Sequence, residues 1–521
     1  MTLTLASAAA LLERHHLLRE IVQGGTWTLD PHRIDACDAP IADVTYDTRT
    51  VANGSMLFVK GAFRPEFLDG VDERGLGVYV AETPYAEHTK APGLIVNDAR
   101  KAMSLLSAEF FDRPQDSLTV IGITGTKGKT TTAYFTQAIL NAVSGNRAAL
   151  FSSVDNCLDG TTYVESDLTT PESLDAFRMM RTAVDNGMKY LVMEVSSQAY
   201  KVNRVYGLTF DVGAFLNISP DHISPIEHPT FEDYLFCKRQ IVSNCHTLVL
   251  GADADHADLI REDAAATGVP VTDFALQGGG DDAEATAASV ARPVDVSHSA
   301  YRIQAAGRDL GEFRLALDGD FNYANAVAAI TIAQAAGVDP GNGKAFHAIE
   351  RVTISGRMEQ FRDPESTTLA IVDYAHNFAS VSALLDFVDE RYGDRNPRVT
   401  LVTGSAGNKA YDRRREIVEA AEHRIAAFVF TQEDTDTEPY LDICKAMRRH
   451  ITDPNVASTI VPDRATAIAS AVDDARAHAD RFNVLLIIGK GNERWIKDRR
   501  NHMPYEGDDR VVARLFGLPR A

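Results

Sequence analysis

A phosphate-binding loop is the strongest chemical signal in the sequence. Segment 124–131, TGTKGKTT, follows an apolar run that predicts a strand and precedes a run that predicts an amphipathic helix. Glycines there let backbone N–H groups turn toward phosphate oxygens, and the helix N-terminus adds partial positive charge. Lys129 would supply positive charge for the β- and γ-phosphates, and Thr130 a hydroxyl for Mg²⁺.

The match to the usual G-x-x-x-x-G-K-[ST] pattern is imperfect, because Ile123 stands where the pattern has its first glycine. The alternative, a glycine-rich turn with a chance Lys-Thr pair, is disfavoured by the strand–helix context. The loop residues predicted to bind ATP are Gly125, Thr126, Lys127, Gly128, Lys129, Thr130 and Thr131.

Three more polar residues follow the loop in an order that suits metal-assisted phosphate chemistry. Glu194 ends the apolar run KYLVME, His222 follows the run DVGAFLNIS, and Lys238 falls in a predicted helix. The carboxyl ends of parallel strands meet at one edge of a sheet, so we expect Glu194 and His222 beside the phosphate loop. Taken singly, they would be a structural acid, a loop histidine and a solvated helix lysine. Their order behind the loop favours the chemical role.

The elements that must position these residues alternate between strand and helix along the chain, which predicts an α/β fold. At roughly 100–200 residues per domain, 521 residues predict about three domains. We predict an N-terminal α/β domain over 1–114, a central P-loop domain with a parallel sheet over 115–354, and a C-terminal Rossmann-like α/β domain over 355–521. The Gly-, Ala- and Asp-rich segment 278–292 is predicted to be a surface loop.

Composition excludes several classes of function. A formal net charge of −21 argues against a nucleic-acid partner. Five scattered cysteines without a C-x-x-C pair indicate a reducing compartment. No run approaches the roughly 18 apolar residues of a membrane span, and the N-terminal stretch resembles an amphipathic helix more than a signal peptide. We therefore expect a cytoplasmic enzyme without a transmembrane segment.

The form of the phosphate loop, T-G-T-x-G-K-T-[ST], and the acid, histidine and lysine behind it resemble the Mur ligase family. The resemblance implies ATP and two Mg²⁺ sites, with Thr130, Glu194 and His222 as metal ligands. It also implies that CO₂ converts Lys238 to a carbamate, N6-carboxylysine, which helps to bind the second Mg²⁺. That reaction needs a neutral amine, which burial favours by lowering the lysine pKa. The implied catalytic residues are Lys129, Glu194, His222 and Lys238.

Two segments resemble the branch of this family that adds the third residue of the peptidoglycan stem peptide. They are TYDTR (45–49) and LTTPE (168–172). The resemblance implies a uridine-binding N-terminal domain and the substrate UDP-N-acetylmuramoyl-L-alanyl-D-glutamate. The implied substrate contacts are Asp47, Thr48, Thr169, Thr170, Ser196 and Arg204. Helix capping by the two threonines and a surface ion pair of Arg204 remain alternatives.

The resemblance extends the ATP site into the C-terminal domain. Asn325, in GDFNYANAVAA, would contact adenine, and Arg357 would bind phosphate. Asp373 and His376 belong to a D-Y-A-H segment that reaches the nucleotide in the family. The family usually continues with T-P, where this chain has Asn-Phe, so the following turn stays open. An ATP site shared by two domains implies closure on binding.

The amino acid to be added is predicted from a loop of the last domain. Family members that add meso-diaminopimelate carry D-N-P-R there, and our alignment puts Asp436 at the arginine position. An aspartate repels a distal carboxylate and attracts a distal ammonium, which predicts L-lysine first and L-ornithine second. The alternative is that 433–438 is an acidic solvated loop, and its register is open by one residue. The implied amino-acid contacts are Lys409, Asp434, Asp436, Gly489 and Glu493.

These inferences predict an ATP-dependent ligase that joins a free diamino acid to the D-glutamate γ-carboxylate through an acyl phosphate, acting as a monomer. A related ligase such as folylpolyglutamate synthase is the nearer alternative, and segments 45–49 and 168–172 argue against it. A P-loop nucleotide switch is the non-enzyme alternative. Segment 408–411, NKAY, lacks the aspartate of the N-K-x-D guanine motif, which disfavours a GTPase switch.

Overall fold

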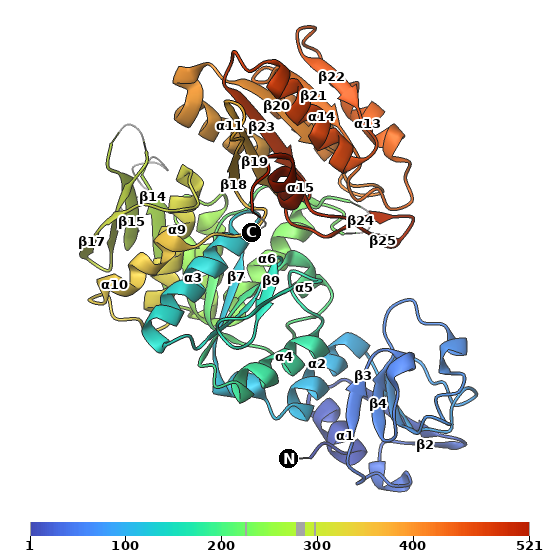
Figure 1. Cartoon of the computed structure of the whole chain (residues 1–521). Coiled ribbons are helices and arrows are strands. Elements are labelled where there is room, and N and C mark those ends of the chain that lie inside the picture. Colours follow the sequence, from blue (N-terminus) through green and yellow to red (C-terminus); the bar gives the residue numbers. More distant parts are fainter. Residues whose placement is uncertain (1, 225–226, 278–286, 296–297, 520–521) are drawn as a thin grey trace.

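Three sheets organise the computed structural model, which describes residues 2–224, 227–277, 287–295 and 298–519 (Figure 1). Each large sheet falls within one of the three predicted residue ranges.

The N-terminal sheet has the order β2-β1-β6-β5-β4-β3, and neighbouring strands from β6 to β3 run parallel. Its strands are β1 Leu18–Gln23, β2 Thr26–Thr28, β3 Asp43–Thr45, β4 Ser55–Phe58, β5 Leu76–Ala81 and β6 Gly93–Val96. Helices α1 (Leu5–Arg14) and α2 (Ala99–Phe110) share one apolar core with this sheet.

The central sheet has eleven strands in the order β10-β9-β8-β11-β7-β12-β13-β14-β15-β16-β17. Its parallel part comprises β8 Ala148–Phe151, β11 Tyr190–Glu194, β7 Thr119–Thr124, β12 Phe210–Phe215, β13 Cys245–Gly251, β14 Val271–Leu276 and β15 Ser289–Pro293. Antiparallel strands flank it: β9 Asp155–Cys157, β10 Tyr163–Glu165, β16 Tyr301–Ala305 and β17 Arg308–Phe313.

Helices cover both faces of the central sheet because alternate side chains of each strand point to opposite faces. In β7, Ile121 and Ile123 pack with helices α3 (Lys129–Ser144) and α9 (Asp320–Ala335). Val120, which points the other way, joins the core beneath the helices of the opposite face. Those helices are α4 Ser173–Asp185, α5 Ser197–Lys201, α6 Phe231–Ser243 and α7 Ala257–Thr267. This burial on two faces explains the nearly continuous apolar runs of the parallel strands.

The C-terminal sheet has the order β18-β19-β23-β20-β21-β22, and only β18 is antiparallel to its neighbour. Its strands are β18 Glu359–Arg362, β19 Thr368–Asp373, β20 Arg398–Thr403, β21 Ala427–Phe430, β22 Ala457–Ile460 and β23 Asn483–Ile488. Its helices are α11 Phe378–Tyr392, α12 Arg413–Ala421, α13 Tyr440–Arg448, α14 Arg464–Ala477 and α15 Asp508–Leu515. A short hairpin, β24 Trp495–Asp498 with β25 Asn501–Pro504, lies beside it.

The α/β prediction is confirmed, and one local prediction is wrong. Segment 278–292 was expected to be a surface loop, but Ser289–Pro293 forms β15, which pairs with β14 and β16. Pairing on both sides overrides the weak strand preference of this alanine-containing stretch. Residues 278–286 lie outside the described part of the chain. Among the described residues, no helix is long and apolar enough to span a membrane.

Candidate functional site

A cavity of about 600 Å³ lies where the central and C-terminal domains meet. The central domain lines it with the phosphate loop, with Glu194 at the end of β11 and with His222 after β12. The C-terminal domain lines it with Arg357, with segment 373–376 after β19, and with loops after β21 and β23. The site thus forms at the carboxyl ends of parallel strands from two sheets, as expected for open α/β sheets.

The phosphate loop connects β7 to α3, as its sequence predicts. Gly128 has φ +80° and precedes the first residue of the helix, and a Cβ there would lie 2.2 Å from Asn325 Oδ1. A side chain at this position is therefore excluded by both conformation and space. Lys129 Nζ donates to the carbonyl oxygens of Gly125 (3.0 Å) and Thr126 (3.3 Å), which holds its ammonium inside the loop. Burial lowers the pKa of Lys129, and Glu194 opposes that shift.

A chain of oxygen atoms joins the loop to Glu194. The hydroxyls of Thr130 and Ser153 lie 3.0 Å apart, and the Ser153 backbone N–H and hydroxyl donate to Glu194 Oε1 at 2.8 and 3.2 Å. Glu194 is fully buried, and its Oε2 has no hydrogen-bond partner among the described residues. A buried carboxyl group with an unsatisfied oxygen beside a hydroxyl and a phosphate loop suits Mg²⁺, which prefers oxygen ligands.

His222 also lines the cavity, with φ +58° and its Nδ1 3.3 Å from Glu227 Oε1. Neither Glu194 nor His222 belongs to a cluster of three His, Cys, Asp or Glu ligand atoms within 4.8 Å in the described part of the chain. An ion held here would therefore complete its coordination shell with hydroxyl, water or phosphate oxygens, which Mg²⁺ commonly uses as ligands.

Lys238 lies on α6 with 1% of its surface exposed. Its Nζ donates to Gly125 O at 2.7 Å, so this helix residue contacts the backbone of the phosphate loop. Burial, assisted by the charge of Lys129, holds the pKa of Lys238 well below its ordinary value. A lowered pKa favours the neutral amine, which is the form of lysine that can react with CO₂.

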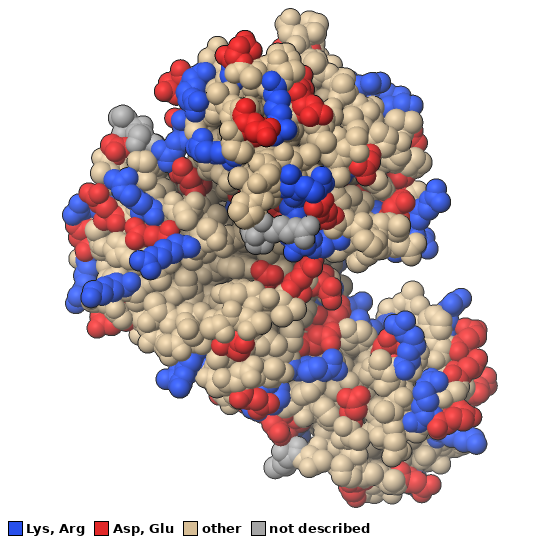
Figure 2. Space-filling view, in the orientation of Figure 1, with Lys and Arg blue, Asp and Glu red and all other residues tan. Residues whose placement is uncertain are grey.

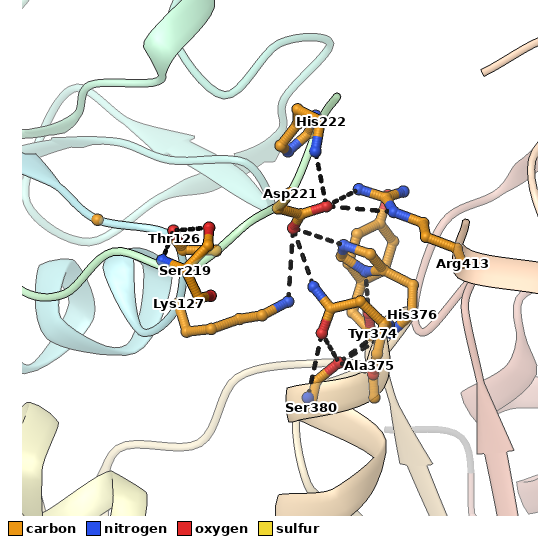
Figure 3. Close-up of polar contacts among 12 residues, drawn as sticks. Thr126, Lys127, Ser219, Asp221, His222, Tyr374, Ala375, His376, Ser380 and Arg413 are labelled. Atoms are coloured by element: carbon orange, nitrogen blue, oxygen red, sulfur yellow. Dashed lines mark hydrogen bonds and ion pairs between the residues drawn. The ribbon is translucent and has the colours of Figure 1, made fainter. Parts of the chain in front are cut away.

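Asp221 joins the two domains inside this cavity (Figure 3). Its carboxylate, only 2% exposed, accepts hydrogen bonds from Arg413 Nη2 (2.7 Å) and Asn377 Nδ2 (2.9 Å) of the C-terminal domain. Lys127 Nζ of the phosphate loop and His376 Nε2 lie 3.7 and 3.9 Å away. Burial alone would raise the pKa of Asp221, but Arg413 and Lys127 outweigh it and hold that pKa well below its ordinary range.

The other residues predicted to contact ATP are assembled at the same cavity. Asn325, Arg357, Asp373 and His376 all line it. Asp373 accepts from the backbone N–H groups of Met358 (2.9 Å) and Ala375 (2.8 Å), so it shapes the chain around the site. The Arg357 guanidinium lies 4.6 Å from the centre of the Tyr374 ring. Burial holds the pKa of His376 well below its ordinary value, which keeps this ring neutral.

Acidic side chains gather at the C-terminal end of the cavity. Glu433, Asp434 and Glu493 line it together with Gly489 and Lys409. Lys490 Nζ donates to Asp434 Oδ1 at 2.8 Å and also pairs with Glu493. Burial raises the pKa of Glu433 to about 7, although Arg464 opposes the shift.

Asp436 does not line the cavity. It has φ +52°, its Oδ1 lies 3.7 Å from Lys497 Nζ, and its Oδ2 accepts from Asn408 Nδ2 at 3.3 Å. The structure therefore brings Asp434 to the cavity from the predicted specificity loop, and Glu433 with it. Asp436 is thus paired with a lysine of the β24–β25 hairpin and does not face the cavity.

The residues predicted to bind the acceptor substrate are spread over the N-terminal and central domains. Asp47 and Thr48 lie in the N-terminal domain, where Asp47 caps the short helix Thr48–Thr50 and pairs with Arg49. Thr169 lines the cavity. Thr170 is buried and donates to Glu194 O at 2.9 Å, so it supports the end of the strand that carries Glu194.

Ser196 and Arg204 complete the predicted substrate contacts. Ser196 caps α5 by accepting from Ala199 N at 3.1 Å. Arg204 forms a part-buried ion pair in which its Nε donates to Glu172 Oε1 at 2.9 Å.

Two family models match the chain. The Mur ligase middle domain matches residues 123–333, and the Mur ligase glutamate ligase domain matches residues 356–491. The chain belongs to the Mur ligase family. UDP-N-acetylmuramyl-tripeptide synthetase of Bifidobacterium longum is 70% identical over 518 residues, which cover 99% of this chain and 100% of that protein. UDP-N-acetylmuramoyl-L-alanyl-D-glutamate–L-lysine ligase of Enterococcus faecalis is 39% identical and covers 98% of each chain.

Solved structures of Mur ligases share the fold. A UDP-N-acetylmuramoyl-L-alanyl-D-glutamate–2,6-diaminopimelate ligase matches with a TM-score of 0.62 and 20% identity over 99% of both chains. Folylpolyglutamate synthase of Mycobacterium tuberculosis matches with a TM-score of 0.59 and 19% identity over 75% of this chain and 91% of its own. The resemblance inferred from the motifs and the prediction of a ligase are both confirmed by the family models and the close relatives.

Among the residues at the cavity that were not predicted as site residues are Ser153, Asp221, Arg413 and Glu433. Asp221 immediately precedes His222, and Arg413 follows the predicted contact Lys409 by four residues, so both lay close to recognised motifs. Ser153 had no such signal, because its role depends on β8 lying beside β11.

Proposed function

We propose that this Mur ligase is of the MurE type and adds L-lysine, or a similar diamino acid, to UDP-N-acetylmuramoyl-L-alanyl-D-glutamate. The observation that carries the proposal is one cavity that joins a phosphate loop, a buried acid suited to Mg²⁺ and an acidic end in the C-terminal domain. Its relatives' names support the acceptor and the amino acid. The product would be a peptidoglycan precursor.

ATP would lie across the domain boundary, with its phosphates on the loop and adenine toward Asn325. Lys129 would neutralise charge on the transferring phosphoryl group, while Thr130, Glu194 and His222 would hold Mg²⁺. When bound, Mg²⁺ would supply Lewis-acid stabilisation of the phosphate oxygens. Carbamylation of Lys238 is supported by its burial and lowered pKa.

The reaction would begin when the D-glutamate γ-carboxylate attacks the γ-phosphorus of ATP, releasing ADP and forming an acyl phosphate. The α-amine of the amino acid would then attack the acyl carbon, expelling phosphate and losing a proton. The chain's contribution is to position the reactants and to exclude water between the domains. Asp373 and Asp221 support this role because they organise the chain where the domains meet.

An ammonium-bearing side chain fits the acidic end of the cavity. Glu433, Asp434 and Glu493 place three carboxyl groups there; Lys490 pairs with the last two, and Lys409 also lines this end of the cavity. A second carboxylate on the incoming amino acid would be repelled by these carboxylates. The specificity therefore rests on Glu433 and Asp434 more than on Asp436, which is paired outside the cavity.

A cytoplasmic location follows from the use of ATP and is supported by five cysteines that are all free and buried.

The test is phosphate release with Mg²⁺, ATP and UDP-N-acetylmuramoyl-L-alanyl-D-glutamate, with L-lysine, L-ornithine or meso-diaminopimelate added in turn. We expect release with L-lysine and none with meso-diaminopimelate. Lys129→Ala is the control and should lower turnover by about a thousandfold, as expected when charge on the transferring phosphoryl group loses its partner. Release with diaminopimelate alone would refute the specificity, and full activity of Lys129→Ala would refute the mechanism.

A further inference from the structure

A buried ion pair lies behind the acidic end of the cavity. Arg464 is the first residue of α14 and Asp508 the first residue of α15. The arginine Nε and Nη2 each donate to one oxygen of the aspartate at 2.7 Å, and both side chains are 0% exposed. Elsewhere on the C-terminal domain, at the top of Figure 2, basic and acidic side chains lie side by side on the surface, where water screens them. Arg464 and Asp508 lack that solvent and depend on each other.

The other hydrogen bonds of this pair reach the two loops that line the acidic end of the cavity. Arg464 Nη2 donates to Ile488 O at 2.6 Å, at the end of β23, and Arg464 Nη1 donates to Gln432 O at 3.4 Å, just after β21. The backbone N–H of Asp508 donates to Gly491 O at 3.1 Å. One arginine and its aspartate thus connect the carboxyl ends of two parallel strands.

The two loops lie closely against each other at the cavity. The residues that follow the two carbonyl groups are Glu433 and Gly489. Gly489 has φ +104°, and a Cβ there would lie 2.5 Å from Glu433 Oε2, so the glycine leaves the space that this carboxyl group occupies. Beside them, Lys490 Nζ donates to Asp434 Oδ1 at 2.8 Å. A change in the separation of the two strand ends would therefore move the carboxyl groups at this end of the cavity.

Stability alone does not explain why this pair is buried. Two charges lose their hydration on burial, and their attraction often does no more than offset that loss, so apolar side chains can replace such pairs without destabilising a protein. A guanidinium supplies what apolar side chains cannot, because its donors point in fixed directions within one plane. Arg464 uses them to hold one carboxylate and two carbonyl groups at once.

We propose that Arg464 and Asp508 are positioning residues for the incoming amino acid, because they fix the separation of the two loops that carry its carboxyl partners. This inference rests on the proposed function, since it takes the amino acid to bind at the acidic end. Neither residue is among those that line the cavity, so each acts through the loops. A free amino acid is held by few contacts, and a small misplacement of one partner weakens its binding more than that of ATP.

Arg464→Lys tests the role of geometry, because it keeps the charge but loses the fixed fork of donors. Arg476→Lys is the matched control. Arg476 lies in the last turn of the same helix, about 18 Å away by the rise of an α-helix. It donates to Asp363 at 2.9 and 3.1 Å and to Leu515 O at 3.1 Å, so it makes the same kinds of contact away from the cavity.

The assay is phosphate release with each substrate varied in turn. In Arg464→Lys the KM for L-lysine should rise about tenfold, with the KM for ATP and for the nucleotide substrate unchanged. Arg476→Lys should keep all three wild-type values. An unchanged KM for L-lysine in Arg464→Lys would overturn the inference, and so would an equal rise in all three KM values, which would indicate a general loosening of the domain. A wild type that turns over no L-lysine would overturn the proposed function instead.

The combined variant Arg464→Met, Asp508→Leu separates positioning from stability. It removes both charges, so neither is left buried without a partner. We expect a folded protein with a single thermal transition and the wild-type KM for ATP, but with the KM for L-lysine raised at least tenfold. A folded combined variant with the wild-type KM for L-lysine would refute the positioning role.

The pH dependence is a readout that a purely structural role would not move. Arg464 of α14, Arg413 of α12, Asp434 and Lys490 act on Glu433. Burial raises the pKa of Glu433 to about 7, and Arg464 opposes this more strongly than the other charges do. Loss of its charge should raise that pKa further, so in the combined variant the KM for L-lysine should fall at a higher pH than in the wild type. Arg464→Lys should keep the wild-type midpoint, and one midpoint shared by all three proteins would overturn an action of Arg464 through Glu433.

Discussion

The ionisation of Glu433 should govern how tightly the enzyme holds its amino acid. Glu433 is 8% exposed, lines the acidic end of the cavity and has a pKa raised to about 7 by burial. An ammonium group of the substrate is attracted by the carboxylate and not by the neutral acid. Since the pKa is raised, the carboxylate is the minor form below pH 7, and amino-acid binding should strengthen as pH rises through that value.

The size of the effect follows from the pKa. With a pKa of about 7, roughly a tenth of Glu433 is ionised at pH 6 and roughly nine tenths at pH 8. The KM for L-lysine should therefore be about tenfold lower at pH 8 than at pH 6, whereas the KM for ATP should change little. In Glu433→Gln the KM should be high at both pH values and nearly independent of pH.

The assay is phosphate release at saturating ATP and nucleotide substrate, with L-lysine varied at pH 6, 7 and 8. Asp442→Asn is the matched control, because Asp442 is an exposed acid on α13, the helix that follows the same loop. A KM for L-lysine that does not change in the wild type would refute the reasoning. So would a tenfold change that persists in Glu433→Gln.

Three further predictions concern the phosphate and domain contacts. Glu194→Gln should raise the Mg²⁺ concentration for half-maximal activity at least tenfold, and an unchanged Mg²⁺ requirement would remove Glu194 from the metal site. Protein incubated with ¹³C-bicarbonate should show a carbamate ¹³C signal that is absent from Lys238→Met, and the same signal in both proteins would refute carbamylation of Lys238. Asp221→Asn should weaken the contact with Arg413, since breaking a buried charge pair costs about 3–5 kcal/mol. Its radius of gyration by small-angle scattering should exceed that of the wild type without nucleotide, and equal radii would show that Asp221 does not hold the domains together.

Local sequence patterns were sufficient to predict the fold class and the phosphate loop. The loop is predictable because its chemistry is local: a strand, glycines that permit a turn, and a lysine at the first turn of a helix all lie within a few residues. Apolar runs predicted the parallel strands because strands buried on both faces need apolar side chains throughout. Segment 278–292 was mispredicted in part because β15 is stabilised by its neighbours and not by its own composition.

By itself, the sequence determined which residues could do chemistry and in what order they occur. Only the tertiary structure decided which of them meet. Asp221 is buried against Arg413, 192 positions away, and Glu172 collects cations from two domains. The same loop that carries Glu433 and Asp434 into the cavity pairs Asp436 with Lys497 outside it. The physical reason is that a charge is stabilised by whatever lies within a few ångströms, and chain folding sets those neighbours without regard to distance along the sequence.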